Sequence, residues 1–396
     1  MGKRAINHTE ILDVRLKKPK VKHAHRKRGK FKPSPGMDVW QYVNDTKMIY
    51  NGTRYSDAEK VKLMKEYYPV LFKEFTKPRL PSYKSPCFCK SYASTSCLKA
   101  WACLPYFYLI GAPKSGTTDL WAQLHRHPAI LYNEKEPHWW SRRNKAIDNM
   151  FGYFEYQRIV VDKNPNAKQG SNLITGDGSA STLWDNLLIM KRAISSTGQL
   201  SLPFTWAEVI HSVQPEAKII AVLRNPINRV MSDYYAFYQH PSPEYFHMLL
   251  LDALQTFKNC LKRCDLRFCA NLPYQPRIQI GLYVVHLQEW FDVFPRDQVF
   301  LLRTEDWHLH RQMRTLPRLF EFLDIDPITD DDLPPLSKRA TDGINIKAVT
   351  QKQGEIYGHI WTKSKELLQN FYRPYNQQLA ALLKDPRFLW IDTPTR

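Results

Sequence analysis

Long apolar runs are missing from the chain. None of its 396 residues belongs to a stretch approaching the roughly 18–20 apolar residues that cross a bilayer. The first thirty residues also lack the apolar segment of a secretory signal. We therefore expect any membrane attachment to come from an anchor that this sequence does not contain.

Acidic residues are scarce as well. The 38 Asp and Glu residues stand against 57 Lys and Arg residues, which gives a formal net charge of +19. A basic surface of this size favours polyanionic partners such as nucleic acid, anionic membranes, or sulfated and carboxylated polysaccharides. Twelve of the basic residues lie between Lys3 and Lys32. We interpret that run as a solvated arm, with nuclear targeting or heparin binding as alternatives.

The paired Cys-x-x-Cys spacing that zinc sites use is absent. The seven cysteines form two groups: Cys87, Cys89, Cys97 and Cys103, and then Cys260, Cys264 and Cys269. Such local groups favour disulfides in an oxidising lumen, with free buried thiols or a metal site as alternatives. The odd number leaves at least one thiol outside any internal pair. Three glycosylation sequons, at Asn7, Asn44 and Asn51, also fit a lumenal chain.

Composition divides the chain near residue 100. Residues 1–100 are polar, basic and rich in Pro and Tyr, and we expect a stem with one helix at 57–75. Over residues 101–396, short apolar runs alternate with amphipathic segments, which predicts an α/β domain with a mainly parallel sheet flanked by helices. The predicted strands are 106–110, 172–175, 218–223 and 298–302. The predicted helices are 204–213, 279–294, 312–323, one from Thr117 or Thr118, one from Pro226, and 363–383 with a break at Pro374.

A glycine-bearing turn, Gly111-Ala-Pro-Lys-Ser-Gly-Thr-Thr118, joins the first of these strands to a helix. Free backbone N–H groups and the positive end of the helix dipole make such a turn a cradle for anions. Gly116 lets the backbone approach anion oxygens, and Thr117 and Thr118 can donate hydroxyls. The turn is P-loop-like, but it departs from the Walker A pattern because Lys114 lies two residues before the second glycine.

A second basic segment begins at the end of the 218–223 strand. Arg224 leaves the strand, and Asn225, Arg229 and Ser232 follow on one helical face. Guanidinium and hydroxyl groups that converge in this way suit a phosphate dianion. The alternative is an ion pair between Arg229 and Asp233 at i, i+4 spacing.

A third segment, Asn133-Glu-Lys-Glu-Pro-His-Trp-Trp140, places one carboxylate between two basic side chains. Glu136 lies between Lys135 and His138 and could accept a proton from a bound hydroxyl. The alternative is an exposed, ion-paired glutamate in a loop.

Together the three segments resemble the Golgi-type carbohydrate sulfotransferases, over about residues 101–390. The resemblance implies that the chain uses 3′-phosphoadenosine 5′-phosphosulfate (PAPS) as the sulfuryl donor. Lys114 would contact the bridging oxygen, and Ser115, Gly116, Thr117 and Thr118 would enclose the 5′-phosphate. Arg224 and Ser232 would bind the 3′-phosphate, with Arg229 as a further candidate.

The third segment resembles the Lys-Glu-x-His-Phe-Phe motif of heparan sulfate sulfotransferases, in which the glutamate is the base. By that resemblance Glu136 and Lys114 are the catalytic residues. Lys135 and His138, together with Arg229, would shape the acceptor site. The resemblance also implies a Golgi lumenal location, a glycosaminoglycan acceptor, and no requirement for a metal or nucleic acid.

One stretch departs from the heparan sulfate pattern. Where those enzymes often carry a lysine, this chain has Thr175-Gly-Asp-Gly-Ser-Ala-Ser-Thr182. Within the family, the chain looks most like the enzymes that add a 6-sulfate to N-acetylgalactosamine 4-sulfate in chondroitin and dermatan sulfate. Other glycan acceptors, a divergent P-loop kinase or NTPase, and a non-catalytic polyanion-binding protein remain the alternatives.

Overall fold

The computed structural model describes residues 39–75, 78–81, 83–89, 101–143, 153, 157, 172–238, 240–310, 314–328 and 359–391. The compact unit to which they belong runs from Val39 to Arg396. The basic run from Lys3 to Lys32 and the sequon at Asn7 lie outside the described residues. Among those described, no helix is long and apolar enough to cross a membrane.

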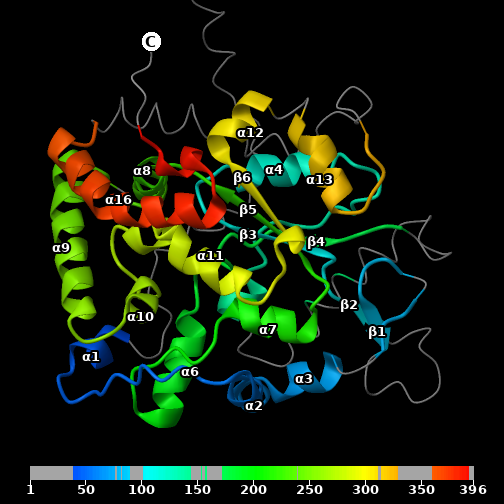
Figure 1. Ribbon diagram of the computed structural model, residues 1–396, viewed down its shortest axis with the longest axis horizontal. Coiled ribbons are helices and arrows are strands. Elements are labelled where there is room, and N and C mark those ends of the chain that lie inside the picture. Colours follow the sequence, from blue (N-terminus) through cyan, green and yellow to red (C-terminus); the bar gives the residue numbers. More distant parts are fainter. Residues whose placement is uncertain are drawn as a thin grey trace, which may run out of the picture. The chain divides into compact units, whose positions relative to one another are not determined.

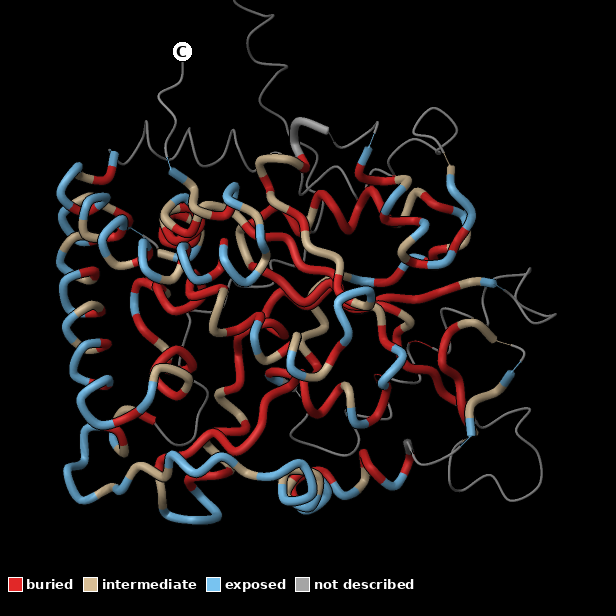
Figure 2. Tube along the Cα trace, in the orientation of Figure 1, coloured by how far each residue is buried: buried red, intermediate tan, exposed pale blue. Residues whose placement is uncertain are grey.

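A four-stranded parallel sheet forms the centre of this unit (Figure 1). Its strands, in the order β4-β3-β5-β6, are Gly176–Asp177, Phe107–Gly111, Lys218–Leu223 and Val299–Arg303. Three of the four predicted strands are therefore confirmed to within one residue. Every residue of β3 is buried, as are the last five of β5 (Figure 2).

The strand predicted at 172–175 was wrong. Ile174 forms only an isolated bridge with Ile130, and the pairing with β3 begins at Gly176. A Cβ at Gly176 would lie 2.3 Å from the Phe107 ring, so this neighbour of Phe107 must be glycine. The position of the strand thus depends on a cross-strand contact rather than on the local apolar run.

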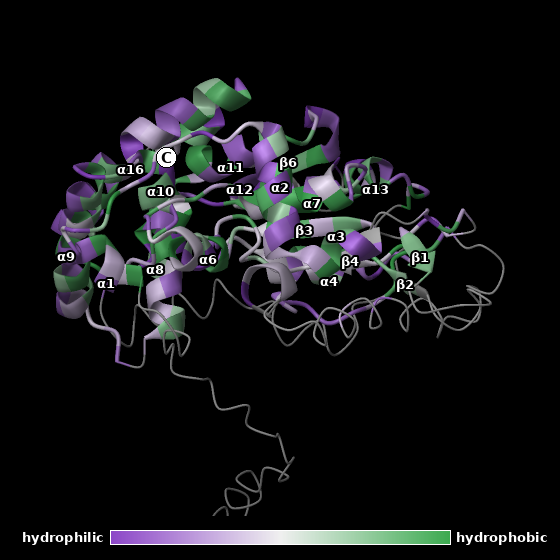
Figure 3. Ribbon diagram, turned by 90° about the horizontal axis from the view of Figure 1, so that it is seen from below, coloured by the Kyte–Doolittle hydropathy of each residue, from purple (hydrophilic) through white to green (hydrophobic). Residues whose placement is uncertain are grey.

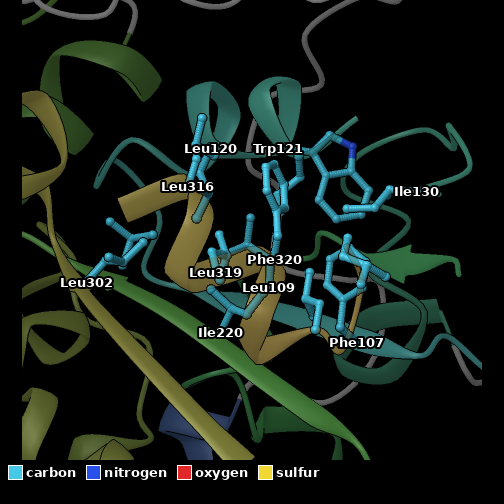
Figure 4. Packing of buried hydrophobic residues seen from close by; sticks show 14 of the residues in the cluster. Phe107, Leu109, Leu120, Trp121, Ile130, Ile220, Leu302, Leu316, Leu319 and Phe320 are labelled. Atoms are coloured by element: carbon cyan, nitrogen blue, oxygen red, sulfur yellow. The ribbon is translucent and has the colours of Figure 1, made fainter. Parts of the chain in front are cut away.

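Side chains alternate between the two faces of β3. Phe107 and Leu109 face helices α4 (Thr117–Leu124) and α13 (Leu316–Phe322), and this cluster forms the core in Figure 4. Tyr108 faces the other side, where its hydroxyl donates to Gln214 Oε1, 2.9 Å away, just after α7 (Trp206–Val213). Helices therefore cover both faces, as predicted for an α/β domain.

Several helix boundaries differ from the predicted ones. The predicted 57–75 helix is two helices, α2 (Asp57–Tyr67) and α3 (Pro69–Phe75), because the residue before Pro69 is disfavoured in helical conformation. The predicted 279–294 helix is a 3-10 turn, Ile278–Gly281, followed by α11 (Tyr283–Phe291). The last helix, α16 (Thr362–Leu383), continues through Pro374, so the predicted break was wrong.

Tertiary packing explains the continuity of α16. It buries Tyr372, Asn376 and Leu379, on both sides of the proline, and packs against α11 and against α8 (Pro226–Phe237). That burial offsets the one backbone hydrogen bond that proline cannot make. The long helix α9 (Pro243–Leu261) carries hydrophilic and hydrophobic residues side by side along its length (Figure 3).

Residues 39–75, which composition assigns to the stem, pack against the rest of the unit. Trp40 Nε1 donates to Pro273 O at 3.3 Å, and Lys60 forms an ion pair with Glu208 of α7 at 2.7 Å. A parallel bridge also pairs Tyr50 with Leu200.

Local disulfides are confirmed in both cysteine groups. Cys87 bonds to Cys103, which joins β1 (Cys87–Cys89) to β2 (Trp101–Cys103), and Cys260 bonds to Cys269. Cys264 is the free cysteine of the described residues, and it is buried. Among the described residues, no group of His, Cys, Asp and Glu side chains could hold a metal ion.

Removing the Cys87–Cys103 bond should lower stability. Because the bond closes a 16-residue separation, its loss should cost about 2–4 kcal/mol of unfolding free energy. The test is chemical denaturation of a Cys87→Ala, Cys103→Ala double variant. Cys264→Ala is the control that removes a thiol without opening a loop, and an equal loss in both proteins would contradict the prediction.

Candidate active site

The turn between β3 and α4 has the conformation of an anion cradle. Gly116 is the N-cap of α4 at φ 89°, and no side chain caps the helix. The first N–H groups of α4 thus lack a capping partner and lie at the positive end of its dipole. Lys114 also has a positive φ, 67°, a conformation that costs a non-glycine residue of order 1–3 kcal/mol. Such strain is typical of functional turns.

Two neighbouring strands hold this turn in place. Arg224, at the end of β5, donates from Nη1 to Lys114 O at 3.0 Å. Thr304, at the end of β6, places its hydroxyl 2.7 Å from Ser115 O and 3.0 Å from Leu223 O. The structure therefore brings the first and second predicted segments together, although they are 110 residues apart in the chain.

The ammonium of Lys114 is half-buried in basic surroundings. Burial lowers its pKa; Asp233 opposes this effect, while Arg224, Arg277 and Arg229 add to it. Within the described part of the chain, it forms no ion pair. A cation held in this way gains from an incoming anion, which would restore the stabilisation lost on desolvation.

The second segment supplies a helix start beside the turn. Asn225 caps α8, because its Oδ1 accepts from Ile227 N at 3.0 Å, and Pro226 occupies the first turn. The Arg224 carbonyl accepts from the Tyr283 hydroxyl at 2.9 Å, and burial lowers the pKa of the Arg224 guanidinium. Ser232 is buried two turns along α8.

Arg229 does not lie at the surface of this site. Its side chain is fully buried, with Nη2 donating to Arg277 O at 2.6 Å and Nη1 lying 3.8 Å from Asp233 Oδ2. Arg229 and Asp233 thus form the i, i+4 pair that was the alternative to a phosphate contact. The structure therefore places Arg229 inside the protein, where it supports α8.

Two hydrogen-bond donors and one imidazole nitrogen lie against the carboxylate of Glu136. Lys135 Nζ contacts Oε1, while His138 Nε2 and Ala180 N each lie 3.1 Å from Oε2. Burial raises the pKa of Glu136, but Lys135, His138 and the Ala180 amide outweigh it, so the pKa lies below its ordinary value. The carboxylate is thus ionised at neutral pH and remains partly exposed.

The tryptophans of the third segment are core residues. Trp139 and Trp140 are buried, and the Trp139 ring stacks on Tyr153 with centroids 5.1 Å apart. They form the start of η1 (Trp139–Arg143), which anchors the end of the segment that carries Glu136.

Comparison with known proteins identifies the family. The profile described as "Sulfotransferase domain" matches residues 105–341. The chain belongs to the sulfotransferase family. Human carbohydrate sulfotransferase 15 is 33% identical over 317 residues, which cover 74% of this chain and 55% of that protein. The Drosophila melanogaster bifunctional heparan sulfate N-deacetylase/N-sulfotransferase is 27% identical over 305 residues, covering 71% of this chain and 26% of that protein.

The chain thus spans about half the length of the carbohydrate sulfotransferase 15 proteins that it matches. A solved sulfotransferase from Alicyclobacillus acidocaldarius is 19% identical and covers 71% of this chain and 96% of that one, with a TM-score of 0.45.

Sequence reasoning missed one wall of this candidate site. Phe237, at the end of α8, is 61% exposed, and its ring centre lies 4.6 Å from the Arg277 guanidinium and 5.9 Å from Lys114 Nζ. The ring centre of Trp184 lies 5.9 Å from the guanidinium carbon of Arg277 and 5.9 Å from that of Arg142. Aromatic and basic side chains thus run from the turn toward the third segment.

No local signal marked that wall. Its members come from four separate parts of the chain, and only the fold brings them together. A hollow of about 500 Å³ also adjoins the second segment, lined by Asn225, Asn228, Arg303, Glu305, Arg387 and Trp390 among others.

Phe237 gives a testable prediction about this wall. An exposed aromatic ring flanked by cations suits a sugar ring that carries anionic groups. We expect Phe237→Ala to raise the acceptor KM about 5–10-fold, the equivalent of about 1–1.4 kcal/mol of aromatic contact, without changing the KM for the donor. Met248→Ala, at another exposed apolar position, is the control. An unchanged acceptor KM in Phe237→Ala would exclude the contact.

Proposed function

We propose that this chain transfers a sulfuryl group from PAPS to a hydroxyl of a glycosaminoglycan sugar. The observation that carries the proposal is the hydrogen bond from Arg224 to the Lys114 carbonyl, which joins an uncapped helix start to a second basic segment. PAPS has two separate phosphate groups, one for each segment, whereas ATP has a single phosphate chain. The fit is therefore to the 3′-phosphorylated donor.

The hydrogen-bond donors of the turn suit the 5′-phosphosulfate. The first N–H groups of α4, the Thr117 and Thr118 hydroxyls and the Lys114 ammonium are all hydrogen-bond donors, as an anion requires. Arg224 and Ser232 would bind the 3′-phosphate. The residues of the hollow beside Asn225 are candidates for contacts with the remainder of the nucleotide.

The reaction needs one step. The acceptor oxygen attacks sulfur in line with the departing phosphate oxygen, so an oxygen–sulfur bond forms as the sulfur–phosphate oxygen bond breaks. Glu136 takes the hydroxyl proton, and its low pKa keeps it ionised and ready to accept. Lys114 stabilises the negative charge that develops on the leaving 3′,5′-bisphosphate.

The acceptor that we propose is the 6-hydroxyl of N-acetylgalactosamine 4-sulfate in chondroitin or dermatan sulfate. The 33% identity to carbohydrate sulfotransferase 15 supports a carbohydrate acceptor, and the absence of a lysine from residues 175–182 separates the chain from the heparan sulfate pattern. The wall of Phe237, Arg277 and Arg142 provides cations for an acidic sugar chain. Heparan sulfate or another glycan is the second candidate acceptor.

A lumenal Golgi location is part of the proposal. Disulfide bonds in both cysteine groups fit an oxidising compartment, and the sequon asparagine Asn44 is exposed.

The decisive experiment offers labelled PAPS to the full chain with a panel of glycosaminoglycans, followed by disaccharide analysis. Label in 4,6-disulfated N-acetylgalactosamine, formed without magnesium, is the expected result. Hydrolysis of ATP that depends strictly on magnesium would favour a P-loop kinase or NTPase. Heparin binding that is lost on deletion of residues 1–35, with no sulfate transfer, would favour a polyanion-binding protein.

A further inference from the structure

The groups behind Glu136 form a chain of hydrogen bonds with a fixed direction. We propose that Ser181 is a positioning residue: its hydroxyl donates to Nδ1 of His138 and so holds the ring as the tautomer that donates from Nε2 to Glu136. The role of Glu136 as the base rests on the proposed function, whereas the direction of donation rests on the contact distances and on a neutral His138 ring.

The donors and acceptors can be assigned in order, beginning at the Glu136 carboxylate. An ionised carboxylate has only acceptor positions, so the 3.1 Å distance between His138 Nε2 and Glu136 Oε2 favours a hydrogen on Nε2. Ala180 N donates to the same oxygen at 3.1 Å, which fixes that oxygen between two donors.

The ring of His138 has a second partner on its other side. Its Nδ1 lies 2.6 Å from Ser181 Oγ, and its backbone N–H donates to Ser179 Oγ at 2.9 Å. A neutral imidazole has one N–H group, and Nε2 already carries it. Nδ1 is therefore an acceptor, and the Ser181 hydroxyl must be the donor.

The surroundings of His138 keep it neutral. Burial lowers its pKa to about 4, against the raising effect of Glu136. Arg142 and Lys135 lower it further, and Asp185, which pairs with Arg142 at 2.9 Å, raises it. With a pKa of about 4, the ring is uncharged at neutral pH.

Ser181 in turn has a partner in η1. Its Oγ lies 2.6 Å from Ser141 Oγ, and both serines are at least 98% buried. Since the Ser181 hydrogen points at His138, its oxygen must accept from Ser141. The order of donation is Ser141, Ser181, His138, Glu136, and water does not compete at the buried end.

This series of hydrogen bonds gives a function to residues 175–182, the stretch that departs from the heparan sulfate pattern. Ser179 and Ser181 lie in the segment where those enzymes often carry a lysine. Without Ser181, only the contact with Glu136 would favour a hydrogen on Nε2, and the Nδ1 tautomer would become accessible. The Nε2 lone pair would then face the Glu136 carboxylate, and the repulsion would move the base from its place.

The first test reads the tautomer directly. In the full chain labelled with ¹⁵N-histidine, with the His138 signals assigned by His138→Gln, we expect a protonated Nε2 and an unprotonated Nδ1 between pH 6 and 8. This measurement requires no activity and no variant of Ser181. A ring with both nitrogens protonated, or with the hydrogen on Nδ1, would overturn the proposal whatever the enzyme's reaction.

The second test compares serine variants in sulfate transfer from PAPS. Ser181→Ala should lower kcat about tenfold, equivalent to about 1.4 kcal/mol, leave the KM for PAPS unchanged, and mix the two tautomers. Ser181→Thr, which keeps the hydroxyl, should restore most of kcat, and Ser196→Ala, at an exposed serine, should match wild type. Wild-type kcat and tautomer in Ser181→Ala would overturn the proposal. Absence of transfer by the wild type would overturn the proposed function instead.

Discussion

Replacing Glu136 by glutamine should lower kcat for sulfate transfer by about 10²–10⁴-fold, the usual contribution of a general base. The amide cannot take the acceptor's proton. It also presents an NH₂ group to a site built from donors, because Lys135, His138 and the Ala180 amide all point at the carboxylate. The KM for PAPS should not change, because none of these groups belongs to the turn before α4.

Glu134→Gln is the matched control, since Glu134 is an exposed carboxylate two residues away. It should retain wild-type kcat. The pH profile provides a further check. The pKa of Glu136 lies below its ordinary value, so the base is ionised throughout the neutral range and activity is lost only as pH falls through that low pKa. Equal kcat in Glu136→Gln and Glu134→Gln would exclude Glu136 as the base.

Lys114→Ala should lower kcat by about 10²–10³-fold, as expected when a cation that stabilises the leaving group is removed. The same substitution should not lower the free energy of unfolding of the ligand-free protein. Burial lowers the pKa of Lys114, so folding disfavours its charged form. The ligand-free variant should be at least as stable as wild type, while stabilisation by PAPS in thermal unfolding becomes weaker.

Lys258→Ala, at an exposed position on α9, is the control for a general loss of positive charge. It should leave both kcat and stabilisation by PAPS unchanged. A Lys114→Ala protein that keeps wild-type transfer would contradict the assignment of the turn, even if the chain is a sulfotransferase.

Local patterns predicted the parts of the site that are contiguous in sequence. The turn at Lys114 and the helix start after Arg224 each depend on residues within one short segment. The sequence alone was therefore enough to predict them. The alternation of apolar runs likewise predicted β3, β5 and β6. A contact between Arg224 and the Lys114 carbonyl was not predicted, because it depends on the order of strands in the sheet.

The errors arose where packing outweighs local preference. Gly176 moves the edge strand because the Phe107 ring occupies the space beside it, and α16 absorbs Pro374 because both halves of the helix are buried. The burial of Arg229 beneath α8 could not be predicted from its spacing either, and its role as a ligand stays a prediction. Ser181 was noted only as part of a stretch without lysine, since its partner His138 lies 43 residues earlier.

The bond between Arg224 and the Lys114 carbonyl has a consequence for the choice of donor. One guanidinium supports the backbone of the turn and, in the proposed function, meets the 3′-phosphate. Each event favours the other, because an Arg224 ordered by the 3′-phosphate also fixes the turn that receives the sulfate. The site would then bind most tightly a donor that carries both the 3′-phosphate and the 5′-phosphosulfate. Adenosine 5′-phosphosulfate, which lacks the 3′ group, would bind without the phosphate contact that orders Arg224.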